Sequence, residues 1–253
     1  MNARVPVLAM AGVLLFLPSL QAQVRQPTSP VGNVGIRFIV AEPLGEFSDY
    51  VDAGFGAGLS GRIPLDPTGV VSLRADLGFL IYGYESKRVC FDGIGCRVQT
   101  RLQTSNNIFF GGIGPELALP LDWARPYVNA FIGFGYFNTT SSLESLWGGE
   151  DQFQTENLGD GTFSWGFGGG LEMYVHRGRV PVAIDLGARY HRNGVMRYLT
   201  KGDILDHPDG SITLFPITSE ADLMSYELGV SIGIPRKGRD EERENWRHDR
   251  ERW

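Results

Sequence analysis

Nine ionisable residues are the strongest chemical signal, because each lies among glycine, serine and apolar residues rather than in a charged run. They are Arg37, Arg62, Arg74, Asp76, Glu116, Glu172, Asp185, Arg189 and Glu227. Four are positive and five are negative, so their charges nearly cancel. If they share one enclosed space, unpaired charges would be costly there, and the balance predicts a cross-linked network of ion pairs. We interpret this network as a structural filling; the functional alternative is a gated conduit in which the pairs rearrange.

Histidine, the usual general base, is scarce in this chain, which has His176, His191, His207 and His248. A hydrolase needs a nucleophile, a base and an orienting acid within reach of one another. Only His191 falls near the end of an expected strand on the side of the charged residues, and its neighbours Arg192 and Asn193 do not form a His-x-Ser arrangement. We therefore expect no catalytic residue, no metal site and no cofactor, and keep a hydrolase as a less favoured alternative.

The first 22 residues have the make-up of an export signal that is removed. Arg4 is followed by the apolar residues 5–17 and by a cleavage region with small residues at 19–22. This apolar stretch is too short for a comfortable membrane-spanning helix. The net charge is −6, and no basic cluster precedes the last 17 residues, which argues against a nucleic-acid partner.

The two cysteines, Cys90 and Cys96, enclose only five residues. In an exported chain, two neighbouring cysteines most simply form a disulfide. Closing so small a loop would stiffen it at modest entropic gain. Metal binding is the weaker alternative, because no histidine lies nearby.

Eight segments of the chain are rich in glycine, aromatic and β-branched residues, and most alternate apolar with polar positions. They lie near 34–41, 53–63, 69–84, 105–119, 125–139, 161–176, 180–193 and 222–235. In the third, Leu73 and Leu77 share one face while Arg74 and Asp76 share the other. A period of two residues is typical of β-strands.

The connections between these segments alternate in length. Those at 42–52, 85–104, 140–160 and 194–221 are long, and those at 65–68, 120–124 and 176–179 are short. Long loops would then lie at one rim and tight turns at the other, as in transmembrane β-barrels. Glycine and charges share one face, which suits the interior of a narrow barrel, whereas the large apolar residues would face lipid. A soluble lipid-binding barrel should show the reverse polarity.

The sequence therefore predicts an all-β protein: an eight-stranded antiparallel up-and-down transmembrane β-barrel with short periplasmic turns and long outer loops. We expect a signal peptide at 1–22, an N-terminal lead at 23–32, the barrel at 33–236 and a charged periplasmic tail at 237–253.

The chain resembles the OmpA/OmpX-like outer-membrane β-barrel proteins over residues 30 to 235. The resemblance lies in the loop rhythm, in 43–47 before a glycine-rich strand, and in the Gly-x-Gly-x-Glu runs at 112–116 and 168–172. In the last strand, Glu227, Gly229, Ile232 and Ile234 fit the pattern that this family presents to the outer-membrane assembly machinery. The final position is Ile rather than an aromatic residue, and a tail follows that is too short for a peptidoglycan-binding domain.

This resemblance implies an outer-membrane protein that is not an enzyme and has a structural or surface-interaction role. Its implied partners are outer-membrane lipids and, during insertion, the assembly machinery, with an unidentified extracellular or periplasmic partner and no nucleic acid. The alternative is a narrow channel or conduit for small molecules. A membrane-embedded lipid hydrolase and a soluble periplasmic lipid-binding barrel are less favoured.

Overall fold

The computed structural model describes residues 30–90, 99–144, 153–207 and 211–235. The expected signal peptide, most of the N-terminal lead and the charged tail lie outside these residues. So does the expected disulfide, because Cys96 falls within 91–98 and the side chain of Cys90 is not described.

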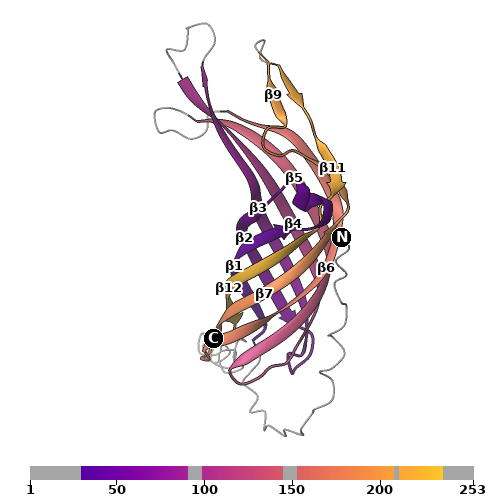
Figure 1. Ribbon diagram of the computed structural model, residues 1–253. Coiled ribbons are helices and arrows are strands. Elements are labelled where there is room, and N and C mark those ends of the chain that lie inside the picture. The colour runs from indigo at the N-terminus through magenta and orange to yellow at the C-terminus, as the bar shows by residue number, and fades with distance from the viewer. Residues whose placement is uncertain (1–29, 91–98, 145–152, 208–210, 236–253) are drawn as a thin grey trace, which may run out of the picture.

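Across these ranges, eight strands close into one antiparallel barrel (Figure 1). In order around the wall they are β1 (Gly32–Pro43), β2 (Gly54–Pro64), β3 (Val71–Cys90), β4 (Gln99–Ala118), β5 (Ala124–Glu144), β6 (Phe153–His176), β7 (Val182–Asn193) and β12 (Leu223–Ile234). Each strand pairs with the next, and β12 pairs back with β1 to close the barrel. The predicted up-and-down topology is confirmed, with short turns at one end and long connections at the other.

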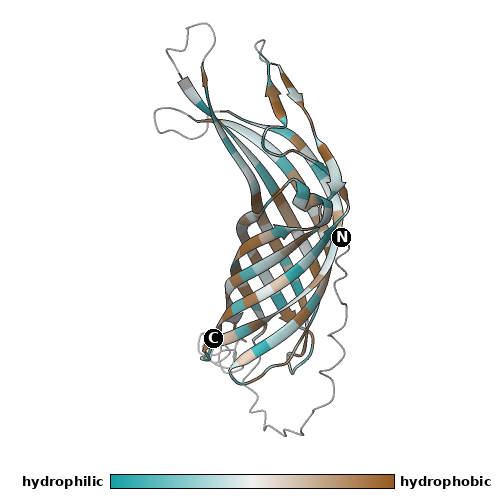
Figure 2. Cartoon of the chain, viewed as in Figure 1, coloured by the Kyte–Doolittle hydropathy of each residue, from teal (hydrophilic) through white to brown (hydrophobic). Residues whose placement is uncertain are grey.

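The alternating pattern produces a wall with two different faces. In β3, Arg74 and Asp76 point inward and are buried, whereas Leu73 and Leu77 point outward and are 37% and 58% exposed. The same arrangement recurs around the barrel, so that every strand exposes large apolar side chains. Examples are Ile36, Leu59, Leu77, Ile113, Ile132, Phe167, Leu186 and Leu228. In Figure 2 the closed part of the barrel accordingly alternates between hydrophobic and hydrophilic residues along each strand.

Two of the expected long loops are mostly strand, which corrects the boundaries at 85–104 and 140–160. Strands β3 to β6 have 20, 20, 21 and 24 residues, against 11 or 12 for the other barrel strands. The ladder between β2 and β3 stops at Ile81, and β3 continues to Cys90 beside β4, a rise of about 30 Å at about 3.3 Å per residue. Because polar residues occupy both faces of this extension, the apolar alternation that marks a strand in the sequence is missing there.

The two remaining long connections also contain structure. Residues 42–52 include a short 3-10 helix, η1 (Gly45–Asp49). The expected loop at 194–221 contains four short strands: β8 (Val195–Tyr198), β9 (Ile204–Asp206), β10 (Ile212–Leu214) and β11 (Ile217–Glu220). β8 pairs with β11, and β9 pairs with β10. None of the helices in the described ranges is long and apolar enough to cross a membrane.

The short turn between β2 and β3 is organised by Asp66. Its carboxylate accepts a hydrogen bond from the amide of Val71 at 2.6 Å and one from the hydroxyl of Thr68. These bonds, that of Thr68 first, lower the pKa of Asp66 to about 2. Gly69 completes the turn with a φ of 72°, a conformation that favours glycine.

We predict that this turn contributes pH-dependent stability. Since the folded-state pKa of Asp66 lies below its ordinary value of 3.8, its contribution is present above that value and is lost as the pH falls towards 2. Asp66→Ala should therefore lower the denaturant midpoint at pH 7, and the difference from wild type should shrink between pH 4 and pH 2. Asp122→Ala, which removes the exposed carboxylate of the next short turn, is the matched control and should change the midpoint little.

Candidate functional site

A network of buried ion pairs fills the half of the barrel interior near the short turns. Within the described residues it joins ten charged side chains drawn from all eight barrel strands. They are Arg37, Arg62, Arg74, Asp76, Glu116, Arg125, Glu172, Asp185, Arg189 and Glu227. Each is less than 8% exposed. The structure thus brings the nine sequence-selected residues together and adds a tenth.

Two carboxylates are the hubs of this network. Asp76 pairs with Arg74 at 3.1 Å, with Arg189 at 2.7 Å and with Arg37. Glu116, on the neighbouring strand, pairs with three arginines: Arg125 at 2.7 Å, Arg74 at 2.9 Å and Arg62 at 3.3 Å. Arg74 contacts both hubs, so the two groups form one continuous cluster.

The other three carboxylates extend the cluster around the wall. Glu172 pairs with Arg62 at 2.8 Å, and Glu227 pairs with Arg37. Asp185 accepts a hydrogen bond from the Tyr127 hydroxyl at 2.8 Å and lies 3.8 Å from Arg74. The guanidinium of Arg74 also lies over the ring of Tyr127, 4.9 Å from its centroid.

Arg125 is the member that the sequence analysis missed. It lies in β5 at alternate positions with Tyr127 and Asn129, which are also buried. The alternation of inward and outward positions in this strand could have identified Arg125 as an inward-facing residue. Arg125 is only the second residue of the strand, however, and it directly precedes a proline. With Arg125 included, the cluster contains five arginines and five carboxylates and is formally neutral.

Glycines give the arginine side chains room inside the narrow barrel. A Cβ atom at Gly168 would lie 2.3 Å from Cγ of Arg189, and one at Gly229 would lie 2.5 Å from Cγ of Arg37. A larger residue at either position would therefore displace a member of the network. This is the physical reason for the glycine-rich inner face read from the sequence.

The other half of the interior contains an apolar cluster beside buried polar residues such as Asn106 and Thr139, which corrects the expectation that aliphatic and aromatic residues face outward throughout. Ile39, Leu80, Ile108 and Phe110 point inward there and are buried. Successive side chains of a strand point to opposite faces whatever their chemistry. Near the long-loop end, some of the inward positions are occupied by apolar residues. This layer continues into the covering loops.

Residues from two long connections close the barrel above this layer. Phe47 of η1 packs its ring against Tyr198 of β8, Phe137 of β5 and Tyr82 of β3, with centroid distances of 5.1, 5.8 and 5.9 Å. The hydroxyl of Tyr82 donates to the carbonyl of Leu199 at 3.2 Å. We call Phe47, Tyr82, Phe137 and Tyr198 the outer plug.

His191 lies at the boundary between the charged network and the apolar layer. Its ring packs between those of Phe110 and Phe131, and Nε2 lies 3.0 Å from Oγ of Ser225. His191 is 3% exposed and Ser225 is fully buried. The pair has the chemical types of a base and a nucleophile, but it is enclosed on every side by the barrel.

The four residues selected as an assembly signal lie in β12. Glu227 and Gly229 face inward, and Ile232 and Ile234 face outward, 44% and 46% exposed. Glu227 therefore belongs to the ion network as well as to the expected signal.

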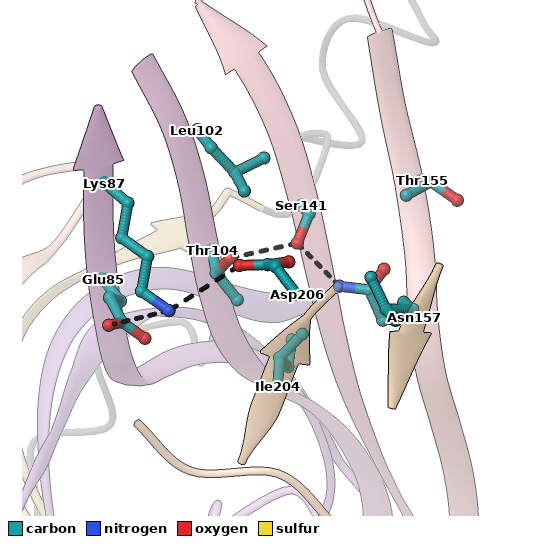
Figure 3. Close-up of a pocket in the computed structure, with 10 residues that line it drawn as sticks. Glu85, Lys87, Leu102, Thr104, Ser141, Thr155, Asn157, Ile204 and Asp206 are labelled. Atoms are coloured by element: carbon teal, nitrogen blue, oxygen red, sulfur yellow. Dashed lines mark hydrogen bonds and ion pairs between the residues drawn. The ribbon is translucent and has the colours of Figure 1, made fainter. Parts of the chain in front are cut away.

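A cleft lies beyond the closed part of the barrel, between the extension of β3 to β6 and the β9–β10 hairpin (Figure 3). Its volume is about 180 Å³. Its lining residues are Glu85, Lys87, Leu102, Thr104, Ser141, Thr155, Asn157, Ile204, Asp206 and Ile212. All ten lie in segments that were expected to be loops, and none was predicted as a site residue.

No protein-family model matches this chain, and no curated protein matches it in sequence. Among solved structures it is similar to Ail, the attachment invasion locus protein of Yersinia pestis, with 12% identity, 81% of this chain and 98% of that chain covered, and a TM-score of 0.45. It is also similar to Neisserial surface protein A (13% identity, 81% and 97% covered, TM-score 0.43) and to the N-terminal β-barrel domain of Pseudomonas aeruginosa OprF (14%, 79% and 96%, TM-score 0.31).

The chain's own geometry defines its class. It is a closed eight-stranded antiparallel β-barrel with an ion network in one half of its interior, an apolar cluster in the other, and an apolar outer wall.

We predict that removing one arginine from the network destabilises the barrel strongly. Arg74→Ala leaves Asp76 and Glu116 with fewer partners in a buried space, and we expect a loss of about 3–5 kcal/mol in the free energy of unfolding. The matched control is Arg192→Ala, because Arg192 forms an exposed pair with Glu220 at 3.3 Å and its loss should cost less than about 1 kcal/mol. Denaturant unfolding of both refolded variants measures the difference; equal losses would contradict a stabilising network.

Proposed function

We propose that this chain is an integral outer-membrane β-barrel protein with a structural or surface-interaction role, exported by the signal peptide expected at 1–22. The observation that carries the proposal is the polarity of the wall. Large apolar side chains are exposed on all eight strands, while the ion pairs are enclosed. A soluble protein rarely exposes a continuous apolar surface of this extent, whereas a bilayer requires it.

Strand length supports the same proposal. A tilted strand needs about 9–11 residues to cross the hydrocarbon layer. β1, β2, β7 and β12, with 11 or 12 residues each, match that length. The extra residues of β3 to β6 all lie at the long-loop end, so they would project beyond the membrane as an outer platform.

We predict that the mature protein fractionates with the outer membrane and requires detergent for extraction. On a gel, unheated and heated samples should migrate differently, because a closed barrel resists unfolding by detergent until it is heated. Leu59→Arg, which places a charge near the middle of the exposed face, should reduce membrane assembly, since an arginine facing mid-bilayer costs about 2–4 kcal/mol. Leu121→Arg, in a short turn, is the control. A mature protein that stays soluble without detergent would overturn the proposal.

A filled interior favours a structural or surface role over the channel alternative. An ion or small molecule would have to pass the outer plug, the apolar layer and the neutral ion network in series. The enclosed position of His191 and Ser225 likewise favours a role without catalysis, because a substrate could not contact either residue.

We predict that the wild-type protein shows no stable conductance in planar bilayers. Phe47→Ala removes the ring at the centre of the outer plug, yet the ion network beneath it should still block steady current. Single-channel recording of both proteins is the measurement, with Tyr84→Ala, an exposed aromatic residue of the extension, as the control. Stable wild-type conductance that changes in Arg74→Ala would favour the conduit instead.

A further inference from the structure

We propose that the outer cleft binds a neutral, hydroxyl-rich saccharide unit. This inference rests on the proposed function, because the cleft must lie on the outward side of the membrane to meet such a ligand. The saccharide is the class of ligand that the proposed surface-interaction protein would bind.

The floor of the cleft is a row of hydrogen-bonding side chains at one level of the sheet. Glu85 of β3 is in register with Thr104 of β4, Thr104 with Ser141 of β5, and Ser141 with Thr155 of β6. All four line the cleft. Neighbouring strands are about 4.8 Å apart, so the row offers acceptors and donors at regular intervals.

A β-bulge adds an amide to this row. The ladder between β5 and β6 shifts between Thr139 and Thr140, which leaves Asn157 as the extra residue. Its Nδ2 donates to Oγ of Ser141 at 2.6 Å, and that hydroxyl lies 3.0 Å from Oγ1 of Thr104 (Figure 3). Bulges re-aim side chains and often accompany functional sites.

The charges of the cleft disfavour an ionic ligand. The ammonium of Lys87 lies 3.5 Å from Glu85 and 4.0 Å from Asp206 of the hairpin, so the cleft carries two carboxylates and one cation. An anion would meet an excess of negative charge, and a cation would compete with Lys87. A neutral ligand avoids both penalties.

The remaining walls and the size of the cleft select among neutral ligands. Leu102, Ile204 and Ile212 supply apolar surface beside the polar row, which suits the C–H faces of a sugar ring. A volume of about 180 Å³ accommodates one small ring rather than a large ligand. The floor strands already pair with each other, so an extended peptide cannot add to them as a further strand.

The test is titration of the refolded, lipid-embedded mature protein with neutral and sulfated oligosaccharides. We expect binding of at least one neutral oligosaccharide, and a loss of affinity of about tenfold in Ser141→Ala, which removes the central hydroxyl of the row. Ser142→Ala is the matched control, because the adjacent residue faces the opposite side of β5 and should leave binding unchanged. Oligosaccharides released from the producing cell's own envelope form one arm and exogenous neutral glycans the other, which separates the two sources.

Three results would overturn the inference: no oligosaccharide binding, binding of sulfated oligosaccharides alone, or binding that Ser141→Ala leaves intact. Capture of an unstructured peptide that Ser141→Ala abolishes, without saccharide binding, would also overturn it in favour of a protein ligand. The heat-dependent gel shift of each variant keeps the two proposals apart. A normal shift without binding refutes only the saccharide site, whereas loss of the shift in wild type refutes the membrane barrel.

Discussion

The rest of the structure depends on the mutual neutralisation of charges inside a narrow barrel. Each of the eight strands contributes at least one member, so the ion pairs link strands that are distant in the wall as well as adjacent ones. Buried charges are tolerated only when they are paired and hydrogen-bonded. That requirement fixes which face of every strand turns inward, because a one-residue slip would carry an arginine or a carboxylate to the apolar outer wall and leave its partner alone.

Two kinds of side chain, charged and apolar, occupy the two halves of the barrel interior. Ion pairs fill the half near the short turns, where glycines such as Gly168 and Gly229 leave space for long side chains. An apolar cluster lies in the other half and continues into the outer plug, where η1 and β8 meet although they are far apart in the sequence. The loops at this end therefore help to close the barrel, and the extension of β3 to β6 continues beyond them.

That extension separates the closed barrel from the cleft. The four long strands carry their hydrogen-bond ladder beyond the closed barrel, which gives the cleft a rigid floor rather than one made of loops. The β9–β10 hairpin supplies the opposite wall and is joined to the floor through Lys87 and Asp206. A rigid floor holds hydroxyl, amide and carboxylate groups at fixed spacing, which favours selective hydrogen bonding.

The barrel, the alternation of long and short connections and nine of the ten network residues could be predicted from the sequence, because side chains in a strand alternate with a period of two and the two faces of this wall differ in polarity. The prediction of strand boundaries was wrong where the two faces no longer differ in polarity. Beyond Ile81 both faces of the strands carry polar residues, so 85–90, 99–104, 140–144 and 153–160 were expected to be loop, and Arg125 was missed at the start of its strand. The outer plug and the cleft could not be predicted, since each joins residues that are distant in the sequence, and no local pattern records which loop packs against which strand.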